Sequence, residues 1–402
     1  MRAREFSRTS DAGQAVGRSC PVDSVDALIQ TIDSVTARTF QFCGYTGLFL
    51  AIMLVMILVG HDGLSPWTMG GIIGTAIATF LGLVVATKIV LGEERIIYYH
   101  HEIAVVAATA LFLRLLHQPV LPYLDITVLG IGLFLSCGRT GCLLVGCCHG
   151  RPFRWGVRYG EEHAHAGFTP YYVGIPLFPV QAIESLSALG IVVAGTSMII
   201  RGAAPGSVLA LYVIVYGFGR FCFEFLRGDP DRPYFLGFSE AQWISVVLMS
   251  AIACEEAIHT LPLFRWHVTT LFLVVATMIG SAVRRHLRCT PTHLLFRPQH
   301  VREIADAIGF VLAAPPVSEC VLRGASQIYV GATSLGIQIS ADLIASGGSS
   351  IRHYALSCRY GLMSPDFVRE VAKLICLLRH ANRVPQIVEG NGGVYHLFVP
   401  LS

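Results

Sequence analysis

The stretch Gly138-Arg-Thr-Gly-Cys-Leu-Leu-Val-Gly-Cys-Cys-His-Gly150 decides the fold, because it ends a long apolar run with residues that apolar helices rarely carry. It holds one arginine, three cysteines, one histidine and four glycines. An ionisable side chain where a helix leaves the hydrocarbon of a membrane is a functional-site hypothesis by default. The segment therefore predicts a membrane helix with a site at its end.

The composition supports a membrane setting. Of the 402 residues, 53% are hydrophobic and 14% are charged, whereas a soluble domain carries roughly 25% charged residues. About 20 apolar residues cross the hydrocarbon core of a bilayer as a helix, and eight mostly apolar segments are predicted to be such helices. They cover residues 42–60, 67–91, 102–116, 123–147, 179–200, 206–226, 242–259 and 266–283.

The composition also divides the chain into three parts. Residues 1–39 are polar and lack the apolar core of a secretory signal, so the first span is expected to stay in the mature protein. Residues 40–283 hold the apolar segments, and residues 284–402 alternate short β-type runs with helical patterns. The predicted fold is an all-α polytopic membrane bundle of about seven to eight transmembrane helices, with a C-terminal soluble α+β domain.

The C-terminal domain has no recognisable catalytic set. Asn391-Gly392-Gly393 predicts a hairpin turn between Val388 and a strand over 394–399. A binding or regulatory module with an unknown partner is the expectation.

The net charge of +3 is too small to indicate a nucleic-acid partner. The positions of the arginines along the chain are more informative than the net charge. The positive-inside tendency would put both basic clusters in the cytoplasm. These clusters are Arg151, Arg154 and Arg158, and Arg284, Arg285 and Arg288.

Arg139 is the first candidate binding residue. It lies in the last turns of the fourth predicted span, where an unpaired guanidinium costs roughly 2.5 to 3.5 kcal/mol on insertion scales. It therefore needs an anionic partner or a wet cavity. Glycines beside it leave backbone amides exposed, and an arginine with free amides suits a phosphate group. The structural alternative is that Arg139 snorkels to the headgroups while the glycines pack helices.

A second set of charges lies on the sixth predicted span. Arg220, Glu224 and Arg227 recur at i, i+4 and i+7, which predicts one shared helical face directed into the protein. Glu224 can then orient one arginine and leave the other for a phosphate-bearing headgroup. Glu184, at the start of the fifth span, is a further carboxylate partner. The alternative is a purely structural salt bridge between spans.

His100 and His101 stand at the start of the third span. Histidine titrates near neutrality and is the usual general base when a thiol or hydroxyl must lose a proton. A pair of tyrosine and histidine residues also anchors helices at membrane surfaces, so both interpretations stay open.

The cysteines of the opening stretch could bind a metal together with His149. Zinc sites favour Cys-x-x-Cys pairs, which are absent here, and the adjacent Cys147 and Cys148 are poorly spaced to ligate one ion. The sequence therefore predicts no metal and no cofactor. Redox or metal function stays as a third, minor alternative.

The opening stretch resembles the signature of the prolipoprotein diacylglyceryl transferase family, in its cysteine-containing form. Three further segments resemble the family's motifs and follow in its order, and together the matches cover roughly residues 40–260. These segments are Phe178-Pro-Val-Gln-Ala-Ile-Glu184, Gly217-Phe-Gly-Arg-Phe-Cys-Phe-Glu-Phe-Leu-Arg227 and Phe238-Ser-Glu-Ala-Gln-Trp-Ile-Ser245.

The resemblance implies an enzyme that moves the diacylglyceryl group of phosphatidylglycerol to the lipobox cysteine thiol of a preprolipoprotein, for lipoprotein biosynthesis. It implies a multi-pass protein of the bacterial inner membrane, in contact with membrane lipids. The family's active site faces the outer side of that membrane. That would place Arg151 to Arg158 outside, against the positive-inside tendency, and we follow the resemblance because arginines near a phosphate site are retained for binding.

The resemblance also implies roles for residues. Where the family has His-Gly-Gly, this chain reads His100-His101-Glu102-Ile103, so His101, with His100 second, is the expected base for the incoming thiol. Arg139 and Arg220 would hold the lipid phosphate, while Glu224 and Arg227 would form a supporting ion pair. The expected lipid- and phosphate-binding set is completed by Glu184 near the active cavity, by Gly150, which closes the signature loop, and by Gly141 and Cys142.

A second function class stays open beside the transferase. It is a non-enzymatic or differently specific phospholipid-binding membrane protein whose C-terminal domain binds a partner. The histidines separate the two classes, because a binding protein needs no base.

Overall fold

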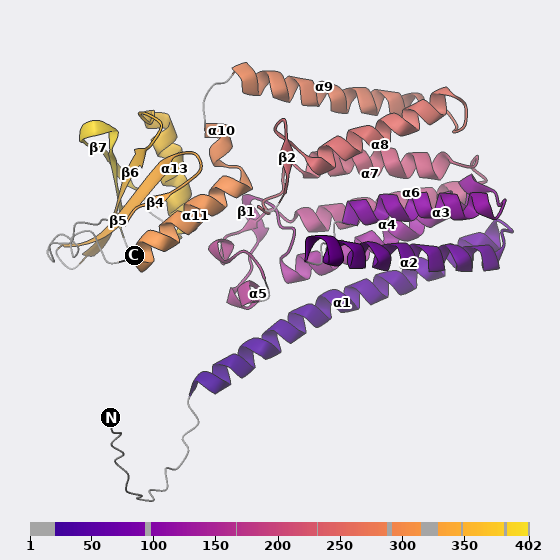
Figure 1. Ribbon diagram of the computed structural model, residues 1–402, viewed down its shortest axis with the longest axis horizontal. Coiled ribbons are helices and arrows are strands. Elements are labelled where there is room, and N and C mark those ends of the chain that lie inside the picture. The colour runs from indigo at the N-terminus through magenta and orange to yellow at the C-terminus, as the bar shows by residue number, and fades with distance from the viewer. Residues whose placement is uncertain are drawn as a thin grey trace, which may run out of the picture.

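The structure, a computed structural model, describes residues 21–92, 98–165, 167–230, 232–287, 292–314, 329–346, 349–381 and 384–400. It is mostly helical up to residue 313 and contains a five-stranded sheet beyond that point (Figure 1). The predicted change from a helical part to a C-terminal α+β part is therefore confirmed.

Within these described ranges, eight long helices form the bundle, and each predicted apolar segment falls on one of them. The helices are α1 (Pro21–His61), α2 (Pro66–Leu91), α3 (Tyr98–Leu115), α4 (Val120–Val145), α6 (Val180–Ile200), α7 (Ser207–Phe223), α8 (Glu240–Ala257) and α9 (Arg265–Leu287).

Five of these helices are long and apolar enough to cross a membrane: Arg38–His61 of α1, Pro66–Val90, Val120–Val145, Val180–Ile200 and Arg265–His286. The predicted count of seven to eight spans is not confirmed. α7 is apolar but has 17 residues, α3 carries Glu102 and Arg114, and α8 carries three glutamates. Charge and length therefore separate these three helices from the other five.

The predicted polar segment 1–39 is helical from Pro21 onward, and its residues 1–20 lie outside the described part of the chain. The N-terminal part of α1 extends away from the other helices (Figure 1).

α4 is the central helix of the bundle. It packs against α1, α3, α6 and α7, and 61% of its span is buried, compared with at most 39% of the other four. Glycines allow the close crossing with α1, because a Cβ at Gly47 would lie 2.7 Å from Cys137 Cβ and one at Gly130 2.7 Å from Val55 Cγ1. Small residues at such crossings let membrane helices approach closely.

Asp125 of α4 caps the start of α7. Its carboxylate accepts the backbone N–H of Gly206 at 2.6 Å and that of Leu209 at 2.7 Å. Gly206 stands at the N-cap position with a φ of 89° and has no side chain to cap the helix. The carboxylate of a neighbouring helix thus satisfies amides that a helix start leaves unpaired.

Short elements connect the helices at one end of the bundle. β1 (Pro152–Val157), α5 (Glu161–His165) and the 3₁₀ turn η1 (Pro170–Tyr172) lie between α4 and α6, and the hairpin of β2 (Tyr234–Phe235) and β3 (Phe238–Ser239) precedes α8. Both basic clusters lie at this end: Arg151 Nε donates to Arg227 O, and Arg285 binds Gly237 O beside β3. Arg288 lies outside the described residues.

The C-terminal sheet is antiparallel in the order β4-β5-β6-β8-β7, with α11 and α13 packed on it. Asn391–Gly393 connects the paired strands β7 and β8, and Gly392 and Gly393 have φ angles of 71° and 78°. The predicted hairpin is therefore confirmed. The elements are α10 (Thr292–Leu295), α11 (Pro298–Ala313), β4 (Gly331–Ala332), β5 (Ile337–Ser346), β6 (Ser349–Cys358), α13 (Pro365–Leu378), β7 (Gln386–Glu389) and β8 (Tyr395–Pro400).

The C-terminal domain shares a hydrophobic core with the bundle's own loops. Phe168 and Tyr172, between α4 and α6, belong to the same buried cluster as Ile304 of α11 and Val371 of α13. α9 returns along the bundle, and the domain lies at the end that carries β1, α5 and β2 (Figure 1). Residues on the two sides of the predicted boundary at residue 284 therefore pack against each other.

We expect Asp125→Ala to lower the free energy of unfolding by about 1 to 3 kcal/mol, because it leaves buried amides of α7 unpaired. Asp125→Asn keeps an acceptor oxygen and should lose less. Thermal unfolding of the purified protein in detergent measures both effects. Asp62→Ala, at an exposed aspartate, is the matched control, and an equal loss in that control would contradict the capping role.

Candidate functional site

Arg139, Glu184 and Arg220 come from three different helices and meet inside the bundle. Arg139 Nη2 lies 3.1 Å and Arg220 Nη1 lies 3.9 Å from the same Glu184 oxygen, Oε1. All three residues are buried, with exposed fractions of 7%, 1% and 8%. A single carboxylate from α6 thus faces the guanidinium groups of α4 and α7.

The end of α7 departs from the predicted pattern. Arg220 Nη1 pairs with Glu224 Oε1 at 2.9 Å, as i, i+4 spacing allows. The helix ends at Phe223, so Arg227 lies in the following segment and not on the predicted shared face. Its guanidinium binds both carboxylate oxygens of Asp229, at 2.9 and 3.1 Å, instead of forming the expected pair with Glu224.

Glu224 has a second partner that the sequence analysis missed. Arg232, from the same segment as Asp229, forms ion pairs with Glu224 and with Asp229. The signal in the sequence is Gly228-Asp-Pro-Asp-Arg232, a charged turn directly after the helix. We call the four arginines 139, 220, 227 and 232, with Glu184, Glu224 and Asp229, the arginine cluster.

The seven residues of the arginine cluster are four guanidiniums and three carboxylates, and the carboxyl group of Glu102 interacts electrostatically with two of these arginines from outside the set. Within the described part of the chain, the buried donors Arg139 Nε and Arg232 Nη2 have no hydrogen-bond partner. Buried donors without acceptors are costly and rare in proteins. The arrangement is therefore suited to an anion with several oxygen atoms.

Neighbouring groups hold the arginine cluster in place. The Thr140 and Ser136 hydroxyls lie 3.1 and 3.0 Å from Ser185 Oγ, beside Arg139 on α4 and Glu184 on α6. Asp229 is stabilised as a carboxylate, because the charges of Arg227 and Arg232 lower its pKa despite its burial.

The signature loop, residues 146–151, joins the end of α4 to the segment after α7. Gly228 N donates to His149 O and Arg151 N to Leu226 O, both at 2.9 Å, which brings Arg227 opposite Gly150. A Cβ at Gly150 would lie 2.3 Å from Phe178 O, so no larger residue fits without a shift of the backbone.

His149 is a structural part of the signature loop. Nδ1 lies 3.0 Å from Gly150 O, which can only accept, so Nδ1 carries the proton and Nε2 accepts from the Thr169 hydroxyl at 3.0 Å. Burial lowers the pKa of His149 below its ordinary value and favours this neutral form. The residue is therefore not available as the metal ligand that the alternative interpretation required.

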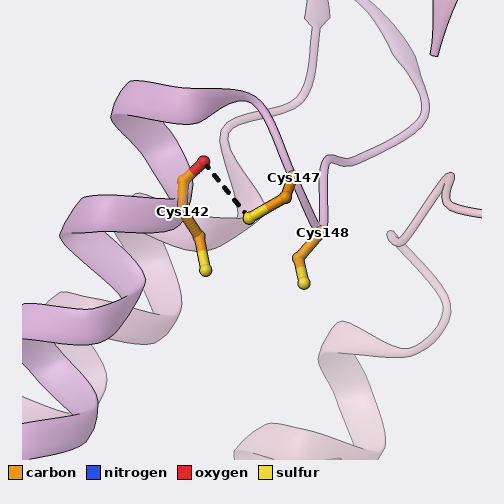
Figure 2. Close-up of side chains that lie close together, drawn as sticks. All are labelled: Cys142, Cys147 and Cys148. Carbon is orange, nitrogen blue, oxygen red and sulfur yellow. Dashed lines mark hydrogen bonds between the residues drawn. The ribbon is translucent and has the colours of Figure 1, made fainter. Parts of the chain in front are cut away.

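The cysteines of the signature lie close together. Gly146 adopts a φ of 90° and reverses the chain after α4, which brings Cys147 and Cys148 close to Cys142. Figure 2 shows the Cys147 side chain directed toward Cys142 O, at 4.0 Å, with Cys148 beside them. All three sulfur atoms lie within 4.8 Å of one another.

Gly141 lies where α4 contacts α1. A Cβ there would lie 3.1 Å from Cys43 Cβ of α1, so Gly141 allows close helix packing. Cys142, also expected in the binding set, belongs to the group of three thiols.

The two histidines of α3 point to different neighbours. His101 is buried, with its ring 4.7 Å from that of Phe80 on α2, whereas His100 Nε2 lies 2.9 Å from Glu240 at the start of α8. Glu102 was not in the predicted set. It accepts the Tyr212 hydroxyl at 2.5 Å and interacts electrostatically with Arg139, Arg220 and Glu184.

The fold and this site define an integral membrane protein with a buried, arginine-rich cluster at one end of a helical bundle. Residues 96–254 match the family model described as prolipoprotein diacylglyceryl transferase. This part of the chain is therefore similar to that family, and it contains the four motifs that carry the resemblance.

Individual relatives agree with the family match. The chain is 36% identical over 127 residues to the phosphatidylglycerol–prolipoprotein diacylglyceryl transferase of Clostridium tetani, covering 32% of this chain and 49% of the relative. It is 34% identical over 132 residues to transferase 2 of Clostridium perfringens, with the same coverage. A third, transferase 2 of Streptomyces coelicolor, is 31% identical over 142 residues, covering 34% of this chain and 44% of the relative. The chain thus spans about half the length of the curated relatives it matches.

We expect Gly150→Ala to separate the signature loop from Phe178 and so lower thermal stability and any phospholipid binding together. The Cβ would overlap a backbone oxygen, which cannot move aside as a flexible side chain can. Thermal unfolding and a phosphatidylglycerol binding assay measure the two losses. Gly190→Ala in α6 is the matched control, because no atom lies within 4 Å of its Cβ position. A Gly150→Ala protein as stable as that control would contradict the packing argument.

Proposed function

We propose that the chain is a phosphatidylglycerol–prolipoprotein diacylglyceryl transferase. The observation that carries the proposal is the buried arginine cluster, with its unpaired donors on Arg139 and Arg232. The family match adds the substrates, because the named relatives act on phosphatidylglycerol and a prolipoprotein. A phosphodiester headgroup supplies the anionic oxygens that these donors lack.

In the proposed reaction, the lipobox thiolate attacks the glyceryl carbon that bears the phosphate oxygen. A carbon–sulfur bond forms as the carbon–oxygen bond breaks, and the electron pair leaves with glycerol phosphate. The thiol proton passes to a base of the protein. In this proposal Arg139 and Arg220 stabilise the negative charge that develops on the departing phosphate, which is the main expected source of rate.

Glu184 positions the two arginines for this role. Its carboxylate contacts both guanidiniums and is itself only 1% exposed. Because Arg139 and Arg220 share the carboxylate of Glu184, each guanidinium keeps N–H donors that can bind the lipid phosphate. Of the predicted phosphate-binding set, this proposal keeps Arg139, Arg220, Glu184, Glu224, Arg227 and Gly150, adds Asp229 and Arg232, and leaves out Gly141 and Cys142.

His101 is the proposed base. It is buried one residue before Glu102, the carboxylate that interacts with the arginine cluster. His100 is half-exposed and engaged with Glu240, which makes it the second choice.

The proposed setting is the bacterial inner membrane, crossed by α3, α7 and α8 in addition to the five long apolar helices. The arginine cluster would then face the outer side. α9 returns to the end of the bundle that carries the site, so the C-terminal domain would lie on that same side. There it would be positioned to contact a partner or an acceptor protein.

We expect Arg139→Ala and Arg220→Ala each to lower kcat by at least about 100-fold, as the loss of one charge-stabilising donor does in other enzymes. Arg139→Lys should also be impaired, because an ammonium cannot replace the fork of donors. The measurement is transfer of a labelled diacylglyceryl group to a lipobox peptide, with mass spectrometry of the thioether product. Arg201→Ala, at an exposed arginine, is the matched control.

The same assay separates the two function classes. A wild-type protein that binds phosphatidylglycerol but gives no thioether product would contradict the transferase proposal and favour a lipid-binding protein.

We expect His101→Gln to lower turnover by about 100- to 10,000-fold, the usual contribution of a general base, while phosphatidylglycerol binding is unchanged. Glu102→Gln keeps an acceptor for Tyr212 and should retain more activity. His61→Gln, at an exposed histidine, is the control for both. The reverse ranking, with Glu102→Gln inactive and His101→Gln active, would remove His101 as the base.

A further inference from the structure

We propose that Cys142, Cys147 and Cys148 form a binding site for one thiophilic d¹⁰ cation such as Zn²⁺. These three residues, the thiol cluster, carry sulfur atoms that all lie within 4.8 Å of one another. The inference can be tested separately from the proposed transferase activity, because its readout is bound metal and not transfer of the diacylglyceryl group.

The spacing of the sulfur atoms fits a single ion. Thiolate ligands lie about 2.3 Å from Zn²⁺, so neighbouring sulfurs of a tetrahedral site are about 3.8 Å apart. The thiol cluster therefore needs each pair of sulfurs to close by about 1 Å at most, which small side-chain rotations supply.

The local backbone explains how adjacent cysteines can share one ion. Gly146 turns the chain back after α4, with its N–H bonded to Cys142 O at 2.9 Å. Cys148 then adopts a φ of 53°, a left-handed conformation that is uncommon for a residue with a Cβ. In an extended segment, neighbouring side chains point to opposite sides. This turn places both on the side of Cys142 (Figure 2).

A cavity gives access to the thiol cluster, and neighbouring arginines can compensate its negative charge. Cys147 and Cys148 line a cavity of about 720 Å³, which has room for a water molecule as the fourth ligand. Three thiolates and a divalent ion carry a net charge of −1. Arg139 and Arg227, which interact electrostatically with Cys148, supply the compensating positive charge.

A bound ion would connect the last turns of α4, at a point one turn after Arg139, to the signature loop. The link would run through Cys142 on the helix and through Cys147 and Cys148 on the loop. The ion would therefore restrain the segment that carries Gly150 and faces Arg227.

Cadmium is the probe for the test, since it binds thiolates and produces an ultraviolet thiolate-to-metal charge-transfer band. The purified full chain in detergent, kept reduced, is titrated with Cd²⁺ and then with Zn²⁺ in competition. We expect one Cd²⁺ per chain with the thiolate band, displaced by Zn²⁺, and a rise in the unfolding temperature.

The variants Cys142→Ser, Cys147→Ser and Cys148→Ser should each lose the high-affinity band and the rise in unfolding temperature. Cys254→Ser, at an exposed cysteine elsewhere, should keep both and is the matched control. Cys147 and Cys148 lie in a loop and are only partly buried, so their variants remain informative if the buried Cys142→Ser unfolds.

The absence of a charge-transfer band in the wild type would overturn the proposal. So would a band that survives the Cys147→Ser and Cys148→Ser changes or that depends on Cys254. This experiment measures bound metal and not diacylglyceryl transfer. Its outcome therefore does not decide the transferase proposal.

Discussion

Arg139 and Arg220 are held in the interior of the bundle by one shared carboxylate, that of Glu184, and much of the surrounding architecture follows from this pairing. An unpaired guanidinium in an apolar interior is strongly disfavoured, and removing one member of a buried ion pair typically costs several kcal/mol. For Arg139 the partner Glu184 comes from a different helix and has to be fixed in position, whereas Arg220 also pairs with Glu224 just beyond the end of its own helix. The hydroxyl contacts between α4 and α6 and the close glycine crossings of α4 with α1 supply that rigidity.

Unpaired donors distinguish this cluster from a purely structural ion pair. A structural pair would be expected to satisfy its donors, because nothing else enters the site. Here Arg139 Nε and Arg232 Nη2 are buried without acceptors among the described residues. An enclosed site with surplus donors is more stable when an anion is bound, which connects the packing of the helices to the recognition of a phosphodiester.

Much of the fold was predictable from the sequence, because apolar runs and charged motifs are local signals. The eight helices, the C-terminal hairpin and the roles of Glu184 and Glu224 as partners of arginines follow from such signals. The position of Arg227 does not, because the residues around Phe223 continue the helical pattern while the pairing with Gly150 ends the helix. The convergence of Cys147 and Cys148 was missed for a similar reason, since it depends on the left-handed backbone at Cys148.

The C-terminal domain lines part of the cavity beside the signature loop. Its helix α11 and the loop at Phe168 both line the cavity that is also lined by Cys147, Cys148 and Asp229. The same loop is packed into the domain's core through Phe168 and Tyr172. A solute that approaches the signature loop through this cavity therefore passes side chains of α11. The domain is part of the wall of the site, so its sequence can influence which molecules reach the thiols.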